Sequence, residues 1–183
     1  MAYKYKEISN PKSGQSIRFL QTAADTKGEL LEMETLYGAH STEPMAHYHP
    51  HQDEDFEVLA GELTIRINGT LQVLKKGETI HIPANTVHAM WNEAEDGTLV
   101  NWKVRPAMDT EYLLETNFGL AYDGKTRENG MPSLLQLAVT ASKYAHVFRV
   151  AKPPFVIQKI LFSILTPFAW LSGKRADYRK YIN

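Results

Sequence analysis

The stretch that decides the fold is residues 47–61, HYHPHQDEDFEVLAG, because it concentrates metal-capable side chains beside a strand pattern. His47 and His49 are two positions apart, so an extended backbone places both imidazoles on one face. Pro50 cannot continue a central ladder, and it therefore ends the strand in a turn. Because this turn brings Glu54 back toward the two imidazoles, the stretch predicts a metal-binding site.

The strand after this turn alternates, and it places Glu54 on the face that looks into the core. A tight turn at residues 60–61 then predicts an antiparallel partner strand. The expected cross-strand pairs are Val58 with Leu63, Phe56 with Ile65, Glu54 with Ile67 and, on the outer face, Asp55 with Arg66. This register leaves Glu54 ionised in an apolar layer, which costs several kcal/mol unless a cation compensates the charge. A metal ion is the obvious cation.

Residues 77–92, GETIHIPANTVHAMWN, form a second informative stretch with a strand, a turn containing Pro83, and a strand that begins at His88. If this hairpin lies beside the first stretch, His88 supplies a fourth ligand and completes a set of three imidazoles and one carboxylate. We expect the other histidines to be structural or exposed. They are His40, His51, His81 and His146.

Together the two stretches resemble the paired motifs of the cupin superfamily, over about residues 30–106 and in the manner of its single-domain members. The matching positions are His47, His49, Glu54 and Gly61 in the first motif and Gly77, Pro83, Asn85, His88 and Asn92 in the second, with fifteen residues between the motifs. The resemblance implies a mainly β fold, a double-stranded β-helix or jelly-roll barrel. The metal ligands that it carries over are His47, His49, Glu54 and His88.

Two positions depart from the family pattern, because Ser41 and Asn85 stand where the family usually has glycine. Asparagine tolerates the left-handed backbone conformation better than other non-glycine residues, so we expect the turn at Asn85 to form. Only the start of the first motif is in question at Ser41.

Mixed nitrogen and oxygen ligands suit a divalent transition metal, and ligand type does not choose among Fe, Mn, Ni, Co, Cu and Zn. Four protein ligands leave positions open on a six-coordinate ion. By analogy with cupins that carry this ligand set, the leading hypothesis is a metal-dependent oxidoreductase of dioxygenase type that acts on a small oxygenated organic compound, aromatic or enol-like. Phe56, Met90 and Trp102 are candidates for the pocket wall, and no catalytic residue is assigned.

Two alternatives stay open. One is a non-catalytic cupin that binds or senses a small molecule through a change in helix packing. The other is a metal-assisted isomerase or lyase, which needs an acid or base beside the metal. Glu57 is the nearest spare carboxylate, but strand alternation points it away from Glu54.

Composition narrows the class of protein further. The chain has 183 residues, 43% of them hydrophobic, and a formal net charge of -1. These values favour one globular domain with an appendage and give no electrostatic footprint for nucleic acid. No cysteine is present, so disulfides and thiolate ligands are excluded. Residues 1–8 contain no apolar run typical of a signal peptide, and we therefore expect a cytoplasmic protein.

Outside the motifs, strands are predicted over 17–22 and 30–37, and Asn68-Gly69 predicts a hairpin between strands 62–68 and 70–74. The outer face of that hairpin carries Leu71, Val73 and Thr64, so it needs a cover. The cover could be helices or a second subunit, and we expect a homodimer in which the barrel sheets or the C-terminal helices meet.

Residues 1–106 are predicted to form the barrel domain and 107–183 a helical extension. Its helices are expected from Asp109, as N-cap, to about 117, over 133–147 and over 154–171, with a turn-rich stretch at 123–132. The last helix has the apolar stripe Ile157, Ile160, Leu161, Ile164 and Leu165. Because it also contains Gln158, Lys159 and Pro167, we expect it to pack on the barrel or on a dimer partner rather than to span a membrane. Binding at a membrane interface is the less favoured alternative, and it rests on the flanking Lys152, Lys174 and Arg175.

Overall fold

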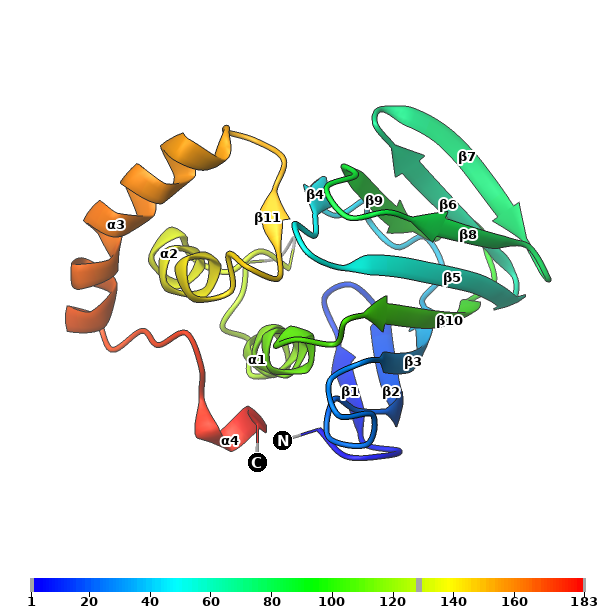
Figure 1. The fold of residues 1–183 in the computed structure, drawn as a ribbon, viewed down its shortest axis with the longest axis horizontal. Helices are drawn as coiled ribbons and strands as arrows, with labels where there is room; N and C mark the ends of the chain where they lie inside the picture. The colour runs from blue at the N-terminus through cyan, green and yellow to red at the C-terminus, as the bar shows by residue number, and fades with distance from the viewer. Residues whose placement is uncertain (1, 128–129, 183) are drawn as a thin grey trace.

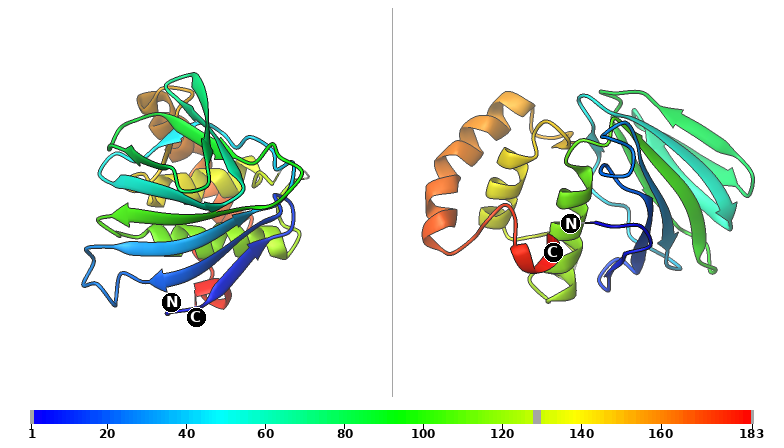
Figure 2. Two further views of the ribbon diagram at one scale, coloured as in Figure 1. Left: turned by 90° about the vertical axis from the view of Figure 1, so that its right-hand side faces the viewer. Right: turned by 60° about the horizontal axis from the view of Figure 1, so that its bottom comes forward.

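The computed structural model describes residues 2–127 and 130–182. Two antiparallel sheets face each other, and the helices gather at one side of them (Figures 1 and 2). The six-stranded sheet has the order β1-β2-β3-β10-β5-β8, and the five-stranded sheet has the order β11-β4-β9-β6-β7. This arrangement confirms the prediction of a mainly β, cupin-like double sheet with C-terminal helices.

The six-stranded sheet consists of β1 (Glu7–Asn10), β2 (Gln15–Gln21), β3 (Leu31–Tyr37), β5 (Asp53–Ala60), β8 (Thr79–Ile82) and β10 (Thr98–Arg105). The five-stranded sheet consists of β4 (His47–Tyr48), β6 (Glu62–Ile67), β7 (Thr70–Lys75), β9 (His88–Trp91) and β11 (Arg149–Val150). Strands β2 and β3 lie where the sequence predicts them. The main core fills the space between the sheets. Its buried members are Tyr37, Phe56, Val58, Leu63, Ile65, Ile82, Met90 and Val100.

The predicted pairing of the strands on either side of Gly61 is wrong. β5 pairs with β10 and β8, whereas β6 pairs with β7 and β9 in the other sheet. Gly61 makes the corner between the sheets, with a φ of +79° and only 2.8 Å from its would-be Cβ to Thr98 Oγ1. Alternation correctly predicts which side chains point inward. It cannot distinguish neighbours within a sheet from residues that face each other across the core.

The predicted pair of Asp55 and Arg66 is wrong for the same reason, because the two residues lie in different sheets. Asp55 instead accepts hydrogen bonds from Arg105 Nη1 at 2.6 Å and lies 2.7 Å from His81 Nδ1. Arg66 Nε donates to Glu43 Oε1 at 2.7 Å. Both arrangements lie at the surface.

The hairpin of β6 and β7 confirms the turn predicted at Asn68-Gly69, where both residues have positive φ, +48° and +86°. Leu71 and Val73 are exposed on the outer face of β7, as expected. Thr64 shares their face, as expected, because it is the cross-strand partner of Val73. It also pairs with Trp91 of β9 and, unlike Leu71 and Val73, it is buried.

The first two helices are α1 (Thr110–Tyr122) and α2 (Leu134–Lys143). Asp109 precedes α1 but makes no side-chain cap, because its carboxylate lies 3.0 Å from His146 Nε2. Ser133 does cap α2 by accepting a hydrogen bond from the Gln136 amide. The second helix is shorter than the predicted 133–147. Within the turn-rich stretch 123–132, residues 128–129 lie outside the described residues.

Helix α3 (Phe155–Leu171) lies at the edge of the molecule, away from both sheets (Figure 1). It packs on α2, and its buried side chains are Gln158, Phe162 and Ala169. Within the single chain the stripe does not pack on the barrel, since Ile157, Ile160, Leu161 and Ile164 are exposed and Leu165 is half-buried. Its expected packing on a dimer partner stays a prediction. A helix that is apolar on nearly every side gives no periodic signal for its buried face. A short helix, α4 (Arg179–Ile182), ends the described chain beside α1.

Residues 2–127 and 130–182 contain no helix with both the length and the apolar character needed to cross a membrane.

Candidate metal centre

Three strands and one turn bring the four predicted ligands together. His47 lies in β4, His49 in the turn after it, Glu54 in β5 and His88 at the start of β9. Strands β4 and β9 pair with His47 opposite His88, and the centroids of these two rings are 4.4 Å apart. One ring nitrogen from each of the three histidines lies within 4.8 Å of the other two. This group could hold a metal ion.

Backbone carbonyls fix how the three imidazoles are turned. His47 Nδ1 lies 3.1 Å from the carbonyl of Met45, His49 Nδ1 lies 2.7 Å from that of Val147, and His88 Nδ1 lies 2.9 Å from a carbonyl in the preceding turn. A carbonyl can only accept, so each Nδ1 carries the hydrogen. In a neutral imidazole this leaves the Nε2 lone pair for a ligand, which is the arrangement of a metal-binding histidine.

Glu54 is buried beside these nitrogens, with its Oε2 atom 3.0 Å from His88 Nε2 and 3.4 Å from His49 Nε2. Its other oxygen, Oε1, accepts a hydrogen bond of 2.9 Å from Trp102 Nε1. Within the described residues, His49 Nε2 and Glu54 Oε2 have no well-aligned hydrogen bond although both are buried. Buried polar atoms rarely stay unpaired. A divalent transition metal would satisfy both atoms, so the residues fit such an ion.

The charges within the group follow from its burial. Burial, with the neighbouring His88 and His49, lowers the pKa of His47 to about 3, so this imidazole is neutral. Burial acts to raise the pKa of Glu54, but the three histidines outweigh it and hold that pKa at about 2. For His88, burial acts to lower the pKa, and the Glu54 carboxylate outweighs it and raises the pKa above its usual value.

The two departures from the cupin motif each have a structural role. Asn85 adopts the left-handed conformation with a φ of +65°, as predicted. Its amide donates to the carbonyl of His49 at 2.8 Å, and its side-chain nitrogen donates to that of Pro50 at 3.2 Å. Ser41 Oγ accepts from the Asn92 amide at 2.8 Å, which ties the start of the first motif to the end of β9. Neither site needs glycine to hold the motif in place.

The C-terminal extension completes the metal centre, which the sequence did not predict. Strand β11 pairs with β4 alongside His47. The Val147 carbonyl orients His49, and the ring of Phe148 stacks on His47 with centroids 4.7 Å apart and an interplanar angle of 28°. The only local signal was the apolar pair Val147-Phe148, which the expected helix over 133–147 obscured.

The four predicted ligands open onto a cavity of about 270 Å³. Phe56, Met90 and Trp102, the candidates for the pocket wall, all line it, and the rings of Phe56 and Trp102 stack with centroids 5.7 Å apart. Sequence reasoning missed other parts of the wall, which are Tyr37 from β3, Leu113, Asn117 and Phe118 from α1, and Phe148.

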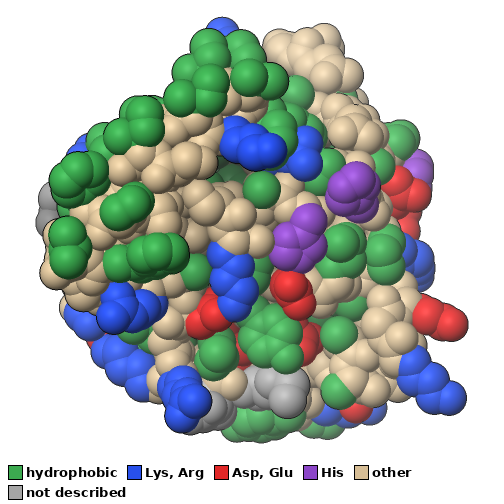
Figure 3. Space-filling view, turned by 60° about the vertical axis from the view of Figure 1, so that its left-hand side comes forward, with side chains coloured by type: hydrophobic (Ala, Val, Ile, Leu, Met, Phe, Trp, Pro, Cys, Tyr) green, Lys and Arg blue, Asp and Glu red, His purple; other side chains and the backbone are tan. Residues whose placement is uncertain are grey.

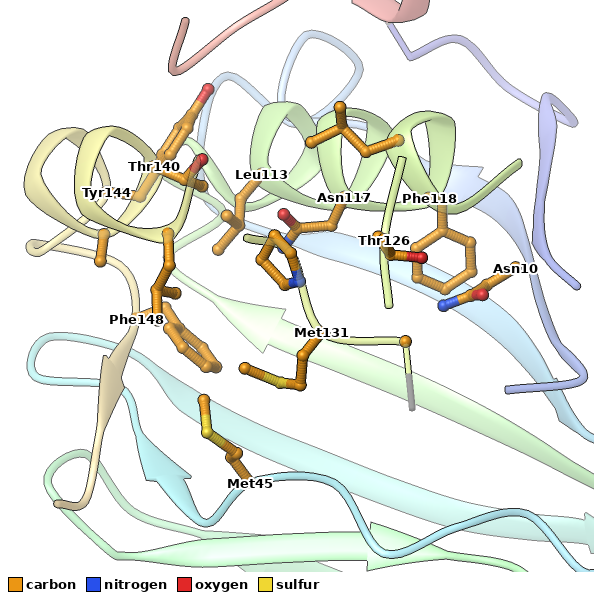
Figure 4. Close-up of a pocket in the computed structure, with 15 residues that line it drawn as sticks. Asn10, Met45, Leu113, Asn117, Phe118, Thr126, Met131, Thr140, Tyr144 and Phe148 are labelled. Atoms are coloured by element: carbon orange, nitrogen blue, oxygen red, sulfur yellow. The ribbon is translucent and has the colours of Figure 1, made fainter. Parts of the chain in front are cut away.

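A second cavity of about 180 Å³ adjoins the first and shares four of its wall residues, Leu113, Asn117, Phe118 and Phe148. Figure 4 shows Met45, Met131 and Phe148 directed toward one another at one side of this space, with Leu113 and Asn117 projecting from α1. The extension therefore contributes wall residues to both cavities.

The remaining histidines lie outside the group. His40 is exposed and pairs with Glu95, His81 is exposed beside Asp55, and His51 is exposed. His146 contacts Asp109 at the edge of the extension.

Residues 32–102 match the family model described as a cupin domain. These residues form a cupin domain. The match ends before α1, so the helical extension lies outside it. No curated protein sequence matches the chain significantly.

Solved structures share the cupin fold at low identity. A predicted oxalate decarboxylase from Thermotoga maritima is 16% identical with a TM-score of 0.50, and the match covers 58% of this chain and 99% of that one. An RmlC-like cupin from Shewanella frigidimarina is 19% identical with a TM-score of 0.49, and the match covers 61% and 93%. A sugar phosphate isomerase of the cupin superfamily from Silicibacter pomeroyi is 16% identical with a TM-score of 0.47, covering 55% and 71%. Likeness at this level concerns the fold alone.

Proposed function

We propose that this cupin binds a divalent transition metal through His47, His49, Glu54 and His88. The observation that carries the proposal is the set of three contacts between imidazole Nδ1 atoms and backbone carbonyls. They leave an Nε2 lone pair for a ligand on each of three clustered imidazoles, and the Nε2 atoms of His88 and His49 lie 3.0 and 3.4 Å from one Glu54 oxygen. Preorganised nitrogen and oxygen ligands of this kind suit Fe, Mn, Ni, Co, Cu or Zn.

We further propose that the protein is an oxidoreductase of dioxygenase type. When bound, an ion with four protein ligands would keep open positions and supply Lewis acidity or dioxygen chemistry there. The cavity wall is dominated by Phe56, Met90, Leu113, Phe118 and Phe148, which suits the body of a small aromatic or enol-like compound. The oxygen of such a compound would face the ligand cluster.

The chain's own acid and base groups favour this reading over an isomerase or lyase. Glu54 is the only carboxylate among the described residues that line the cavity, and Trp102 and the histidines engage both of its oxygens. Glu57, the spare carboxylate considered from the sequence, is exposed on the other face of β5. Tyr37 lines the cavity, and burial together with the charge of Glu54 raises the pKa of its phenol, which stays neutral and can donate a hydrogen bond.

A non-catalytic binding or sensing module is the second candidate. The contacts that favour it are those of residues 147–150, which touch His47 and His49 and then lead directly into α3. A ligand that shifted these residues would change the packing of the extension, which is how a sensor could pass on its state.

Metal analysis and oxygen consumption test the proposal together. The purified protein is stripped, reloaded without oxygen with each candidate metal, and then given catechols, flavonols and diketones in the presence of dioxygen. Metal-dependent oxygen uptake is expected with at least one compound, and none with His88→Ala. Saturable binding without turnover would favour the sensing module. Equal metal content in His88→Ala and the parent protein would rule out the proposed metal site.

A further inference from the structure

The side of α3 that faces away from α2 is apolar along its whole length. Buried Gln158, Phe162 and Ala169 lie on one stripe, as their spacing of four and seven residues requires. We use the name outer face of α3 for the exposed large side chains elsewhere on this helix. They are Val156, Ile157, Ile160, Leu161, Ile164, Phe168, Trp170 and Leu171.

The outer face of α3 is too large to be an ordinary surface feature. Ile160 and Ile164 are each 59% exposed, Phe168 is 57% exposed and Leu171 is 86% exposed. Single exposed apolar residues are common, but a contiguous row of this size marks a binding surface. Lys159 is the only charged residue in the helix, and it lies to one side of the row.

The C-terminal part of the chain, which contains α3, carries mostly positive charges. Residues 145–183 contain seven Lys or Arg and a single acidic residue, Asp177, whereas residues 1–144 contain thirteen basic and twenty acidic residues. Asp177 itself is engaged by Lys143 and Tyr144. Figure 3 shows Lys and Arg side chains beside hydrophobic ones on the side of the molecule that α3 occupies. A basic, apolar face on an otherwise acidic protein would turn toward an anionic surface.

We propose that the outer face of α3 docks on the surface of an anionic lipid bilayer, with the helix lying in the plane of the membrane. Lys152 precedes the helix and Lys174 and Arg175 follow it, so cations stand at both ends where lipid phosphates would lie. Trp170 and Phe168 add aromatic side chains of the kind that favour the membrane interface. A wide apolar face flanked by basic residues is the pattern of an interfacial helix.

Charge also argues against a second copy of the chain as the occupant of this face. A symmetric antiparallel pair of α3 helices would bring Lys152 of one copy toward Lys174 and Arg175 of its partner. Such like-charge contacts oppose association. A homodimer formed through β7 remains a prediction that this proposal leaves untouched.

Vesicle flotation of the full chain tests the proposal, using phosphatidylcholine alone and phosphatidylcholine mixed with phosphatidylglycerol. The parent protein is expected to float with the anionic vesicles, less at high salt, and weakly with phosphatidylcholine alone. The double variant Ile160→Glu, Ile164→Glu should bind at least ~10-fold more weakly, because it places two charges in the lipid-facing row. Emission from Trp170 should shift to the blue on binding.

A matched control lies outside α3 and the strands, where Tyr3 and Tyr122 are 62% and 71% exposed. The double variant Tyr3→Glu, Tyr122→Glu adds the same charge and should float like the parent. Circular dichroism and metal content verify that both variants fold. Failure of the parent to float, equal flotation of the two double variants, or equal binding to neutral and anionic vesicles would each overturn the proposal. A parent protein that does not bind vesicles but forms a dimer in solution would also overturn the proposal, if Ile160→Glu, Ile164→Glu dissociates that dimer.

Discussion

The metal centre and the outer face of α3 depart in opposite directions from the rule that apolar groups are buried and charged groups face water. At the metal centre, Glu54 is 1% exposed and is ionised among three histidines. On α3, Leu171 is 86% exposed, and Phe168 and Ile164 of the same outer face are 57% and 59% exposed. Each region is unfavourable in water as it stands, and for each we have proposed an occupant, a metal ion at Glu54 and a lipid surface at α3.

The two regions differ in how rigidly the surrounding residues hold their side chains. Carbonyls from three separate segments orient the imidazoles, and Trp102 holds one oxygen of Glu54, so the metal centre is built to a fixed geometry. The outer face of α3 needs no such geometry, because burial of apolar surface has no direction. We therefore expect single substitutions to act sharply at the metal centre and gradually on α3.

The largest effect should come from removing a ligand. Glu54→Ala or His88→Ala should weaken metal binding by more than ~100-fold, because each removes a ligand outright while changes beyond the ligands cost roughly 10- to 100-fold. Mass spectrometry of bound metal after dialysis measures this. His81→Ala changes an exposed histidine of β8 and is the matched control. Equal losses in His81→Ala and His88→Ala would mean that the centre is misplaced.

Acidification should have the next largest effect. Protons compete with a metal for Nε2, and the pKa of His88 is raised above its usual value, so metal should be lost as the pH falls through and somewhat above the ordinary histidine range. His47, with its pKa lowered to about 3, should not compete in this range. Metal retained after dialysis at a series of pH values from about 8 to about 5 measures the loss. Complete retention at about pH 5 would contradict the expectation.

The contrast also explains what the sequence could and could not predict. The alternation of β4 and β5 was enough to place His47, His49 and Glu54 toward one another, because side-chain direction is a local property of a strand. Adding His88 required the resemblance to cupins. The pairing of β5 with β6 was wrong because the corner at Gly61 depends on contacts with Thr98, far along the chain.

Other parts of the site were beyond local patterns altogether. The hydrogen bond between His49 and the Val147 carbonyl joins residues 98 positions apart, and no period or motif links them. Trp102 was placed in the pocket wall, but its hydrogen bond to Glu54 depends on how β10 packs beside β5. The buried face of α3 could not be predicted either. Apolar residues lie on nearly all sides of this helix, so the pattern does not single out one face as buried.

Trp102→Phe should have a moderate effect, because it keeps a ring in the wall and removes the hydrogen bond that holds Glu54 Oε1. We expect metal affinity to fall roughly 10- to 100-fold, as for other groups that orient a ligand. Isothermal titration with Zn²⁺ measures this. Trp170→Phe is the same change on α3 and should leave metal affinity unaltered. An unchanged affinity in Trp102→Phe would show that Glu54 needs no support from the indole.

The smallest effect should come from the surface, where Asp55 and Arg105 pair at 2.6 Å but are 42% and 46% exposed. Solvent and salt screen such a pair, so its coupling should contribute at most ~1 kcal/mol to the free energy of unfolding. A double-mutant cycle with Asp55→Ala and Arg105→Ala, followed by urea unfolding, measures the coupling. The same cycle with Arg66→Ala should give none, because Arg66 lies in the other sheet. Coupling of Asp55 to Arg66 but not to Arg105 would restore the register expected from the sequence and contradict the division of β5 and β6 between two sheets.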